Sequence, residues 1–150
     1  MSTLARLTAD LTTAMKARDT DRTSILRQVI GAVRAEEKAG SVARELSDDE
    51  VLKVLAREVK KRRESAQIYT DAGATDRASV ETREADAIET YLPTPLSDDE
   101  LAALVQDVIA SVGATSIRDM GGVMKEATAR AGTSADGKKL SALVRSSLGG

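Results

Sequence analysis

The stretch from 46 to 73, LSDDEVLKVLAREVKKRRESAQIYTDAG, constrains the fold most, because it predicts one long helix with both ends marked. Ser47 is placed to cap the helix, and Glu50, three residues later, is placed to reach back and complete a capping box. Gly73 suits the left-handed residue that closes a helix. Between these ends, apolar residues recur at helical spacing and predict one buried face. They are Leu52, Leu55, Val59, Ala66 and Tyr69.

Apolar periodicity predicts three further helices in the first part of the chain. One covers about 3–17, a second follows the turn at 19–21 and ends near Lys38, and a third runs from about Asp76 to Tyr91. The short turns between such stripes indicate antiparallel neighbours. The predicted stripes are Leu4, Leu7, Leu11 and Met15, then Leu26, Val29, Ile30 and Val33, and then Val80, Glu84, Ala87, Ile88 and Tyr91.

The two prolines of the chain, Pro93 and Pro95, predict a domain boundary because they end the preceding helix and favour extended backbone. We therefore predict a helical bundle over 1–92, with about four helices around the long one, and a small three-helix domain over 96–150. Ser97 with Glu100, and Ser116 with Asp119, are further predicted caps. The stripes expected in this second domain are Leu101, Leu104, Val105, Val108 and Ile109, then Ile117, Met120, Met124 and Ala127, and then Leu140, Leu143, Val144 and Leu148.

Composition favours an all-α fold. Hydrophobic residues make up 41% of the chain but aromatic residues 1%, so the core must consist of aliphatic side chains, which suit closely packed helices better than a sheet. The start of the chain has no apolar run long enough for a signal peptide or a membrane span. We expect a soluble cytoplasmic protein without membrane contact, and the absence of cysteine agrees with a cytosolic location.

The chain offers little for catalysis. It contains no histidine and no cysteine, which removes the commonest general base, the commonest metal ligand and the thiol nucleophile. Asp48, Asp49 and Glu50 resemble a metal cluster, but a role in capping accounts for them. Serine and lysine are plentiful, yet no spacing singles out a nucleophile and its base. We expect no catalytic residue, no metal and no cofactor.

Two groups of basic residues are candidates for binding an anion. The long helix carries Lys60, Lys61, Arg62 and Arg63 close together, which is typical either of a solvated helix face or of a surface facing phosphates. Near the end of the chain, Lys138 and Lys139 follow Gly137 at the opening of the last predicted helix, where the helix dipole disfavours cations unless an anion docks there. Gly121 and Gly122 would permit close approach of another backbone. Tight helix packing with a solvated helix start is the alternative interpretation.

Several short segments, in order along the chain, resemble the YqeY family, whose members are stand-alone relatives of the C-terminal part of the GatB subunit of the tRNA-dependent amidotransferase. Each segment is weakly specific, but together they span nearly the whole sequence. They are Ala14-Met15-Lys16-Ala17, Leu26-Arg27, Glu58-Val59-Lys60-Lys61-Arg62-Arg63-Glu64-Ser65, Tyr91-Leu92-Pro93 with Leu96-Ser97, Asp119-Met120-Gly121 with Val123-Met124, and Ala135-Asp136-Gly137-Lys138. Gly122 departs from the family pattern, in which lysine is frequent at this place.

The resemblance implies a helical bundle followed by a three-helix tail that holds tRNA, without the amidotransferase domains that carry out chemistry. A label of glutamine-dependent carbon–nitrogen ligase activity would thus describe the relative. The leading hypothesis is a non-catalytic accessory module in translation that contacts tRNA, or a protein partner carrying tRNA, by shape and phosphate contacts. The alternatives are a helical protein–protein interaction module and, third, an enzyme in its own right. The residues expected to face nucleic acid are Lys125, Gly137, Lys138, Lys139 and Arg145, with Lys60, Lys61, Arg62 and Arg63 as a second contact.

Overall fold

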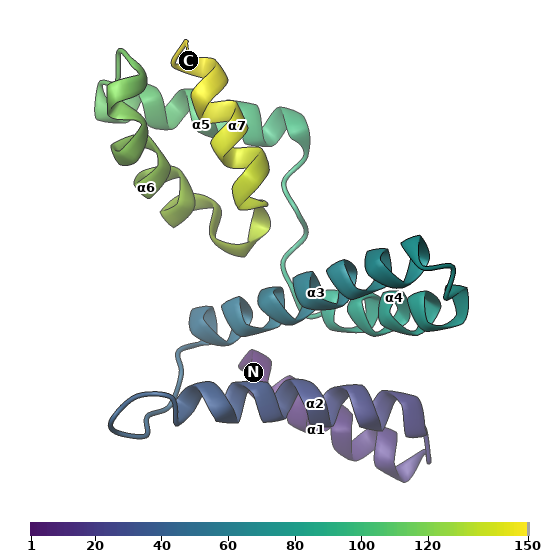
Figure 1. The fold of residues 1–150 in the computed structure, drawn as a ribbon. Coiled ribbons are helices and arrows are strands. Elements are labelled where there is room, and N and C mark those ends of the chain that lie inside the picture. The colour runs from purple at the N-terminus through teal and green to yellow at the C-terminus, as the bar shows by residue number, and fades with distance from the viewer. Residues whose placement is uncertain (150) are drawn as a thin grey trace. The chain divides into compact units, whose positions relative to one another are not determined.

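A computed structural model describes residues 1–149, and within them the chain is all-α, as the sequence predicts (Figure 1). No strand occurs in this range. Two compact units divide at residues 92 and 93, next to the proline pair, and we call them the N-terminal unit and the tail unit. The described elements are α1 (Thr3–Lys16), α2 (Thr20–Glu37), α3 (Asp48–Asp71), α4 (Thr75–Glu89), α5 (Asp98–Val112), the 3-10 turn η1 (Ile117–Asp119), α6 (Met120–Ala131), the 3-10 turn η2 (Gly132–Ser134) and α7 (Gly137–Ser147).

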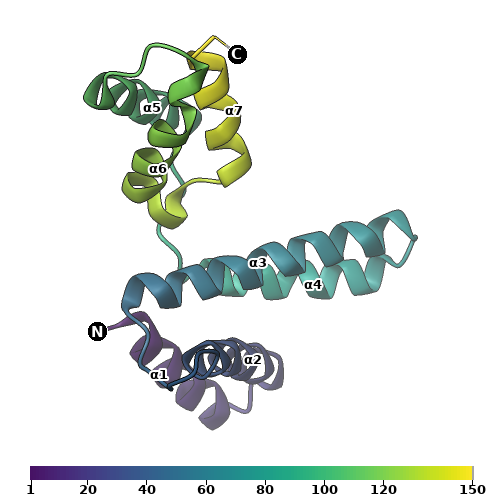
Figure 2. The same ribbon diagram turned by 60° about the vertical axis from the view of Figure 1, so that its left-hand side comes forward.

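The N-terminal unit consists of two antiparallel helical hairpins, α1–α2 and α3–α4, packed on each other (Figures 1 and 2). Their apolar stripes meet in one cluster to which all four helices contribute. Leu55 and Val33 are fully buried there. Tyr91, just after α4, closes the cluster and is 6% exposed. Burial of these aliphatic faces, more than helix propensity, holds the hairpins together.

Most of the expected helix ends form as predicted, although Ser97 caps α5 only by accepting from the Glu100 N–H, without the return bond of a capping box. Ser47 and Glu50 make the capping box of α3, with Oγ of Ser47 accepting from the Glu50 N–H at 3.2 Å. Gly73 adopts the left-handed conformation after α3, with φ of 76°. Ser116 and Asp119 form a second box, at the 3-10 turn η1, and the N–H groups of Thr115 and Ser116 lower the pKa of Asp119.

The tail unit packs α5, α6 and α7 around a second aliphatic cluster. Val105, Val108, Val123 and Val144 are fully buried in it. The segment that follows the proline pair is held to the tail unit by a hydrogen bond from the Leu96 N–H to the Ser134 carbonyl, at 2.8 Å. Within the described residues, no single helix is long and apolar enough to cross a membrane, although α5 and the segment 117–134, bent by 94°, reach that length and composition as a pair.

Some predicted stripe residues are not buried. Met15, Val80 and Ile117 are between 42% and 49% exposed. Along α3 and α4, the small side chains of Ala78 and Ala85 face the neighbouring helix, so Val80 falls on the outer side of α4. Ile117 lies in a 3-10 turn, where the α-helical period used to place it does not apply. Val123 and Ala131 take its place in the core.

Candidate nucleic-acid interface

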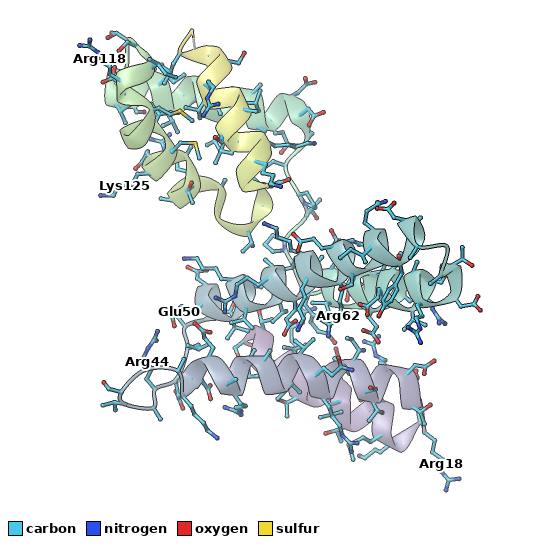
Figure 3. The ribbon with its side chains drawn as sticks, in the orientation of Figure 1. Arg18, Arg44, Glu50, Arg62, Arg118 and Lys125 are labelled. Carbon is cyan, nitrogen blue, oxygen red and sulfur yellow. The ribbon has the colours of Figure 1, made fainter. Side chains whose placement is uncertain are left out.

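Arg62 does not belong to an exposed basic patch, contrary to the prediction. Its side chain is 7% exposed, and Figure 3 shows it pointing from α3 into the space between the hairpins. The guanidinium donates to the carboxylates of Glu58 at 2.9 Å and Glu84 at 3.2 Å, and to Oε1 of Gln28 at 2.9 Å. All three nitrogens are used, so Arg62 joins α2, α3 and α4 and is closed to a ligand.

The next arginine of the window, Arg63, is also bound to carboxylates. It pairs with Asp86 at 2.7 Å and with Glu89 at 2.5 Å, both on α4. These partners hold the pKa of Arg63 above its ordinary value, the hydrogen bond to Asp86 being the largest cause. Its side chain is 39% exposed, but its charge is already neutralised within the unit. Of the predicted four, this leaves Lys60 and Lys61, both exposed and, within residues 1–149, with no carboxylate within 4.0 Å.

In the tail unit, Lys125, Lys138 and Arg145 are exposed, and within the described residues none has a carboxylate oxygen within 4.0 Å. Lys138 and Arg145 lie seven residues apart on α7 and therefore share one helix face. That face is opposite the buried Leu140 and Val144, so it points to solvent. Lys125 lies on the outer face of α6 in the same way, opposite Val123 and Ala127, and Figure 3 shows it extending from the ribbon.

The start of α7 does not form an open anion cradle. The Asp136 carboxylate caps the helix and accepts from the Lys138 N–H at 2.9 Å, so a negative group already occupies this end. Lys139 reaches α5 instead, where its Nζ lies 3.0 Å from Oδ1 of Asp98. Both side chains of that pair are well exposed, so the pair contributes little to stability. Lys139 can therefore leave Asp98 and bind a ligand instead. Gly137 meets nothing within 4 Å of an added Cβ, so no close contact in this chain requires glycine there.

The predicted close approach at Gly121 and Gly122 is not used within the chain. A Cβ built at either glycine meets no atom within 4 Å, and both residues are exposed in the first turn of α6. The packing interpretation of these glycines is therefore wrong for the described residues. They form an open surface beside Lys125.

Sequence reasoning left Arg118 out of the site. This residue lies in η1, is exposed, and within residues 1–149 has no carboxylate within 4.0 Å. Figure 3 shows Arg118 and Lys125 extending to the same side of the tail unit. The sequence places Arg118 in the helix predicted to follow Ser116, whereas in the structure it lies in a 3-10 turn that precedes α6.

The charges of the tail unit are divided between its elements. From residue 93 onward the sequence has six basic and seven acidic residues, so the unit as a whole is not basic. Four of the acids, Asp98, Asp99, Glu100 and Asp107, belong to α5. The segment from η1 to α7 carries all six basic residues and three acids. Cations thus concentrate on α6, α7 and η1, and one of the three acids there, Asp119, is engaged by backbone N–H groups.

Among the described residues, no group of three or more acidic side chains is placed to hold a metal ion. The cavity beneath Tyr91, lined by Leu7, Ile25 and Ile88, measures about 10 Å³, which is space for one water at most. Tyr91 itself donates its hydroxyl to Asp10, and burial, followed by that contact, raises the pKa of Tyr91 to about 12. This tyrosine is a structural anchor between α1 and the end of α4.

A family model described as Yqey-like protein matches residues 4–148 of this sequence. The chain belongs to the YqeY family. The match covers both units, so the bundle and the tail are parts of one family architecture and not a fusion of unrelated pieces. A comparison with curated proteins finds no match.

Proposed function

We propose that this YqeY protein is a non-catalytic module that binds folded RNA of the tRNA class through phosphate contacts. The observation that carries the proposal is the set of exposed cations on α6, α7 and η1 that lack carboxylate partners in residues 1–149. Membership of the YqeY family agrees with it, because the resemblance stated from the sequence implies a tail comparable to the tRNA-holding part of GatB. The contact residues are Lys125, Lys138 and Arg145, with Arg118 beside them, Lys139 available by exchange from Asp98, and Lys60 and Lys61 on α3.

Shape and charge, not base stacking, set the mode of binding in this proposal. The chain has two aromatic residues, and Tyr91 is buried. Single-stranded RNA is usually bound by stacking bases on aromatic side chains, so such a ligand is disfavoured. A folded RNA presents its phosphates on a rigid frame, which exposed lysines and arginines on a helical scaffold can follow.

The test is a titration of the purified chain with bulk tRNA at several salt concentrations. The triple variant Lys125→Gln, Lys138→Gln, Arg145→Gln should weaken binding and lower the slope of log affinity against log salt by roughly one for each lost phosphate contact. The matched control is Arg44→Gln, Arg57→Gln, Arg130→Gln, which removes the same charge from arginines already paired with Glu50, Glu36 and Glu126. Equal loss in both variants would reduce the effect to net charge and contradict the proposed interface.

A second candidate, a docking site for another protein, is favoured by apolar side chains at the tip of the α3–α4 hairpin. Ile68 is 66% exposed and Val80 is 42% exposed. Water contact at such residues has a cost that a protein partner would remove. If Ile68→Ser with Val80→Ser abolishes association with a protein while the triple tail variant leaves tRNA affinity unchanged, this second function is the correct one.

A further inference from the structure

A groove at the end of the first hairpin has cationic and neutral walls. It measures about 710 Å³ and is open to solvent. Arg18 lies in the turn between α1 and α2, and Arg27 lies on α2. Between them, the α2 residues Thr20, Thr23 and Ser24 line the groove with hydroxyl groups. Met15 and Arg27, which also line the groove, lie in the segments Ala14–Ala17 and Leu26–Arg27, to which the proposed tail interface gives no role.

Both arginines of this groove are free to bind an anion. Within residues 1–149, neither Arg18 nor Arg27 has a carboxylate within 4.0 Å, and both are exposed. Figure 3 shows Arg18 extending away from the ribbon. The neighbouring groove of about 320 Å³ between α2 and α4 differs, because Asp19, Asp21 and Glu84 line it together with its arginines. In the part of the chain that the structure describes, acidic side chains therefore line the neighbouring groove but not the first one.

The backbone at Arg18 is held in a conformation that favours glycine. Its φ is 57°, and no other non-glycine residue between 1 and 149 has a positive φ. The helix ends at α1 and α3 share one hydrogen-bond pattern: the Asp19 N–H bonds to the Ala14 carbonyl as the Ala74 N–H bonds to the Tyr69 carbonyl. At α3 the left-handed position is taken by Gly73, and at α1 by Arg18. An arginine in this place costs stability that glycine would not.

The other wall of the groove is also fixed in place. Nη2 of Arg27 lies 3.8 Å from the sulfur of Met15, so the guanidinium reaches from α2 towards the end of α1. Gln28 donates from Nε2 to Oγ of Ser24 at 3.3 Å, and its Oε1 accepts from the buried Arg62. Within the described residues, the hydroxyls of Thr20 and Thr23 make no hydrogen bond, whereas Thr8, Thr12 and Thr13 on α1 bond back to their own helix. In the described residues, two hydroxyls without a hydrogen-bond partner and two guanidiniums without a carboxylate partner therefore line one groove.

We propose that this groove binds a chain of phosphate groups, with Arg18 and Arg27 pairing with successive phosphates and Thr20 and Thr23 donating hydroxyl hydrogen bonds to phosphate oxygens. Guanidiniums and hydroxyls are the usual partners of phosphate. The openness of the groove favours an extended chain over a small ligand, which would need enclosure. The phosphates come from an RNA backbone or from inorganic polyphosphate, and as an RNA contact the inference rests on the proposed function. It assigns the N-terminal unit a binding surface of its own.

The experiment measures the binding of the full chain to inorganic polyphosphate and to bulk tRNA. The variant Arg18→Gln with Arg27→Gln should lose about tenfold in affinity for polyphosphate, because two of the ion contacts are removed. The matched control is Lys38→Gln with Lys53→Gln, at the far end of α2 and on α3. It removes two exposed cations that, among the described residues, likewise have no carboxylate within 4.0 Å. An affinity for polyphosphate within about twofold of the unchanged protein, or an equal loss in the control, overturns the inference.

The two probes separate this inference from the proposed function. If polyphosphate binding depends on Arg18 and Arg27 while tRNA does not bind, the groove stands and the proposed function falls. If tRNA binds through the tail cations while Arg18→Gln with Arg27→Gln changes neither ligand, the groove falls alone. Arg18→Gly adds a check on folding, because it should raise the melting temperature while weakening polyphosphate binding, which a misfolded variant would not do.

Discussion

Arg62 on α3 donates a hydrogen bond of 2.9 Å from Nη2 to Oε1 of Gln28 on α2, across 34 positions of sequence. The same guanidinium holds Glu58 and Glu84, so one buried cation connects three of the four helices of the N-terminal unit. Gln28 continues the connection to Ser24, at the groove beside Arg27. A side chain that the sequence assigned to the second nucleic-acid contact therefore organises the scaffold, and through Gln28 it supports a surface on α2.

Arg62→Ala should destabilise the fold by about 3–5 kcal/mol, because it leaves Glu58 and Glu84 partly buried without their cation. Lys60→Ala, two residues earlier on the same helix, should change the free energy of unfolding by less than about 0.5 kcal/mol, since its side chain is exposed and unpaired in the described residues. Urea unfolding of the two variants checks this. Similar costs at both positions would contradict the assignment of Arg62 to an interior network.

Leu55→Ala should cost about 2–5 kcal/mol, the range for removing most of a leucine from a closed core. Leu55 is 0% exposed and lies in the cluster to which all four helices contribute. Leu52→Ala is the control, because that residue belongs to the same predicted stripe but is only partly buried, and its cost should be smaller. A change at Leu55 below about 0.5 kcal/mol would mean that α3 packs by a different face.

Sequence reasoning succeeded where a local pattern determines the outcome. The capping box at Ser47 and the left-handed Gly73 depend on residues within a few positions, and the buried faces of α2, α5 and α7 follow from the helical period alone. The all-α fold follows from the same periods and from the near absence of aromatic residues.

The candidate site could be predicted less well, because pairing depends on residues distant in sequence. Glu84 and Gln28 bind Arg62 from other helices, and Asp98 binds Lys139 from α5. No spacing in the sequence indicates such partners. Val80 was predicted to be buried for a related reason. Hydrophobicity alone favours burial of the larger valine, but α4 packs closely on α3 through small residues, so Ala78 and Ala85 are buried instead.

Arg18→Gly should stabilise the protein by about 0.5–1 kcal/mol, although it removes a long side chain. The relief of the left-handed backbone outweighs the extra freedom that glycine gives the unfolded chain. Thermal and urea unfolding measure the change, and Arg18→Ala, which keeps a Cβ, should show no gain. Destabilisation by Arg18→Gly would show that the arginine side chain supports the turn in a way that its φ of 57° does not reveal.

Gly122→Ala should stabilise α6 by about 0.5–1 kcal/mol and leave RNA affinity unchanged, because alanine favours helix and the added Cβ meets no atom within 4 Å. Gly122→Lys places a further cation one turn from Lys125. It should strengthen tRNA binding and steepen its salt dependence by roughly one phosphate contact. Gly122→Lys with an affinity equal to that of Gly122→Ala would argue against a phosphate near this end of α6.

Tyr91 should make the fold sensitive to alkali. Its pKa is raised from an ordinary value of 10.0 to about 12, chiefly by burial and then by the hydrogen bond to Asp10, so the unfolded chain loses this proton at lower pH than the folded one. The contribution is fully present below about pH 10 and is lost as the pH rises towards 12, a fall of about 2 kcal/mol in the free energy of unfolding. Other groups also titrate in this range, so the measured quantity is the difference from a variant that lacks the hydroxyl.

Tyr91→Phe is that variant. It keeps the ring in the core and the contact with Arg6, whose guanidinium carbon lies 5.2 Å from the ring centroid, but it removes the donor to Asp10. At pH 7 it should cost about 1 kcal/mol for the lost hydrogen bond. Above pH 10 its stability should fall less steeply than that of the unchanged protein. The free energies of unfolding of the two proteins, measured with urea and plotted against pH, should therefore converge and then cross. Parallel falls in both proteins would mean that the Tyr91 hydroxyl ionises as easily in the folded chain as in the unfolded one, and that its burial beside Asp10 has no energetic consequence.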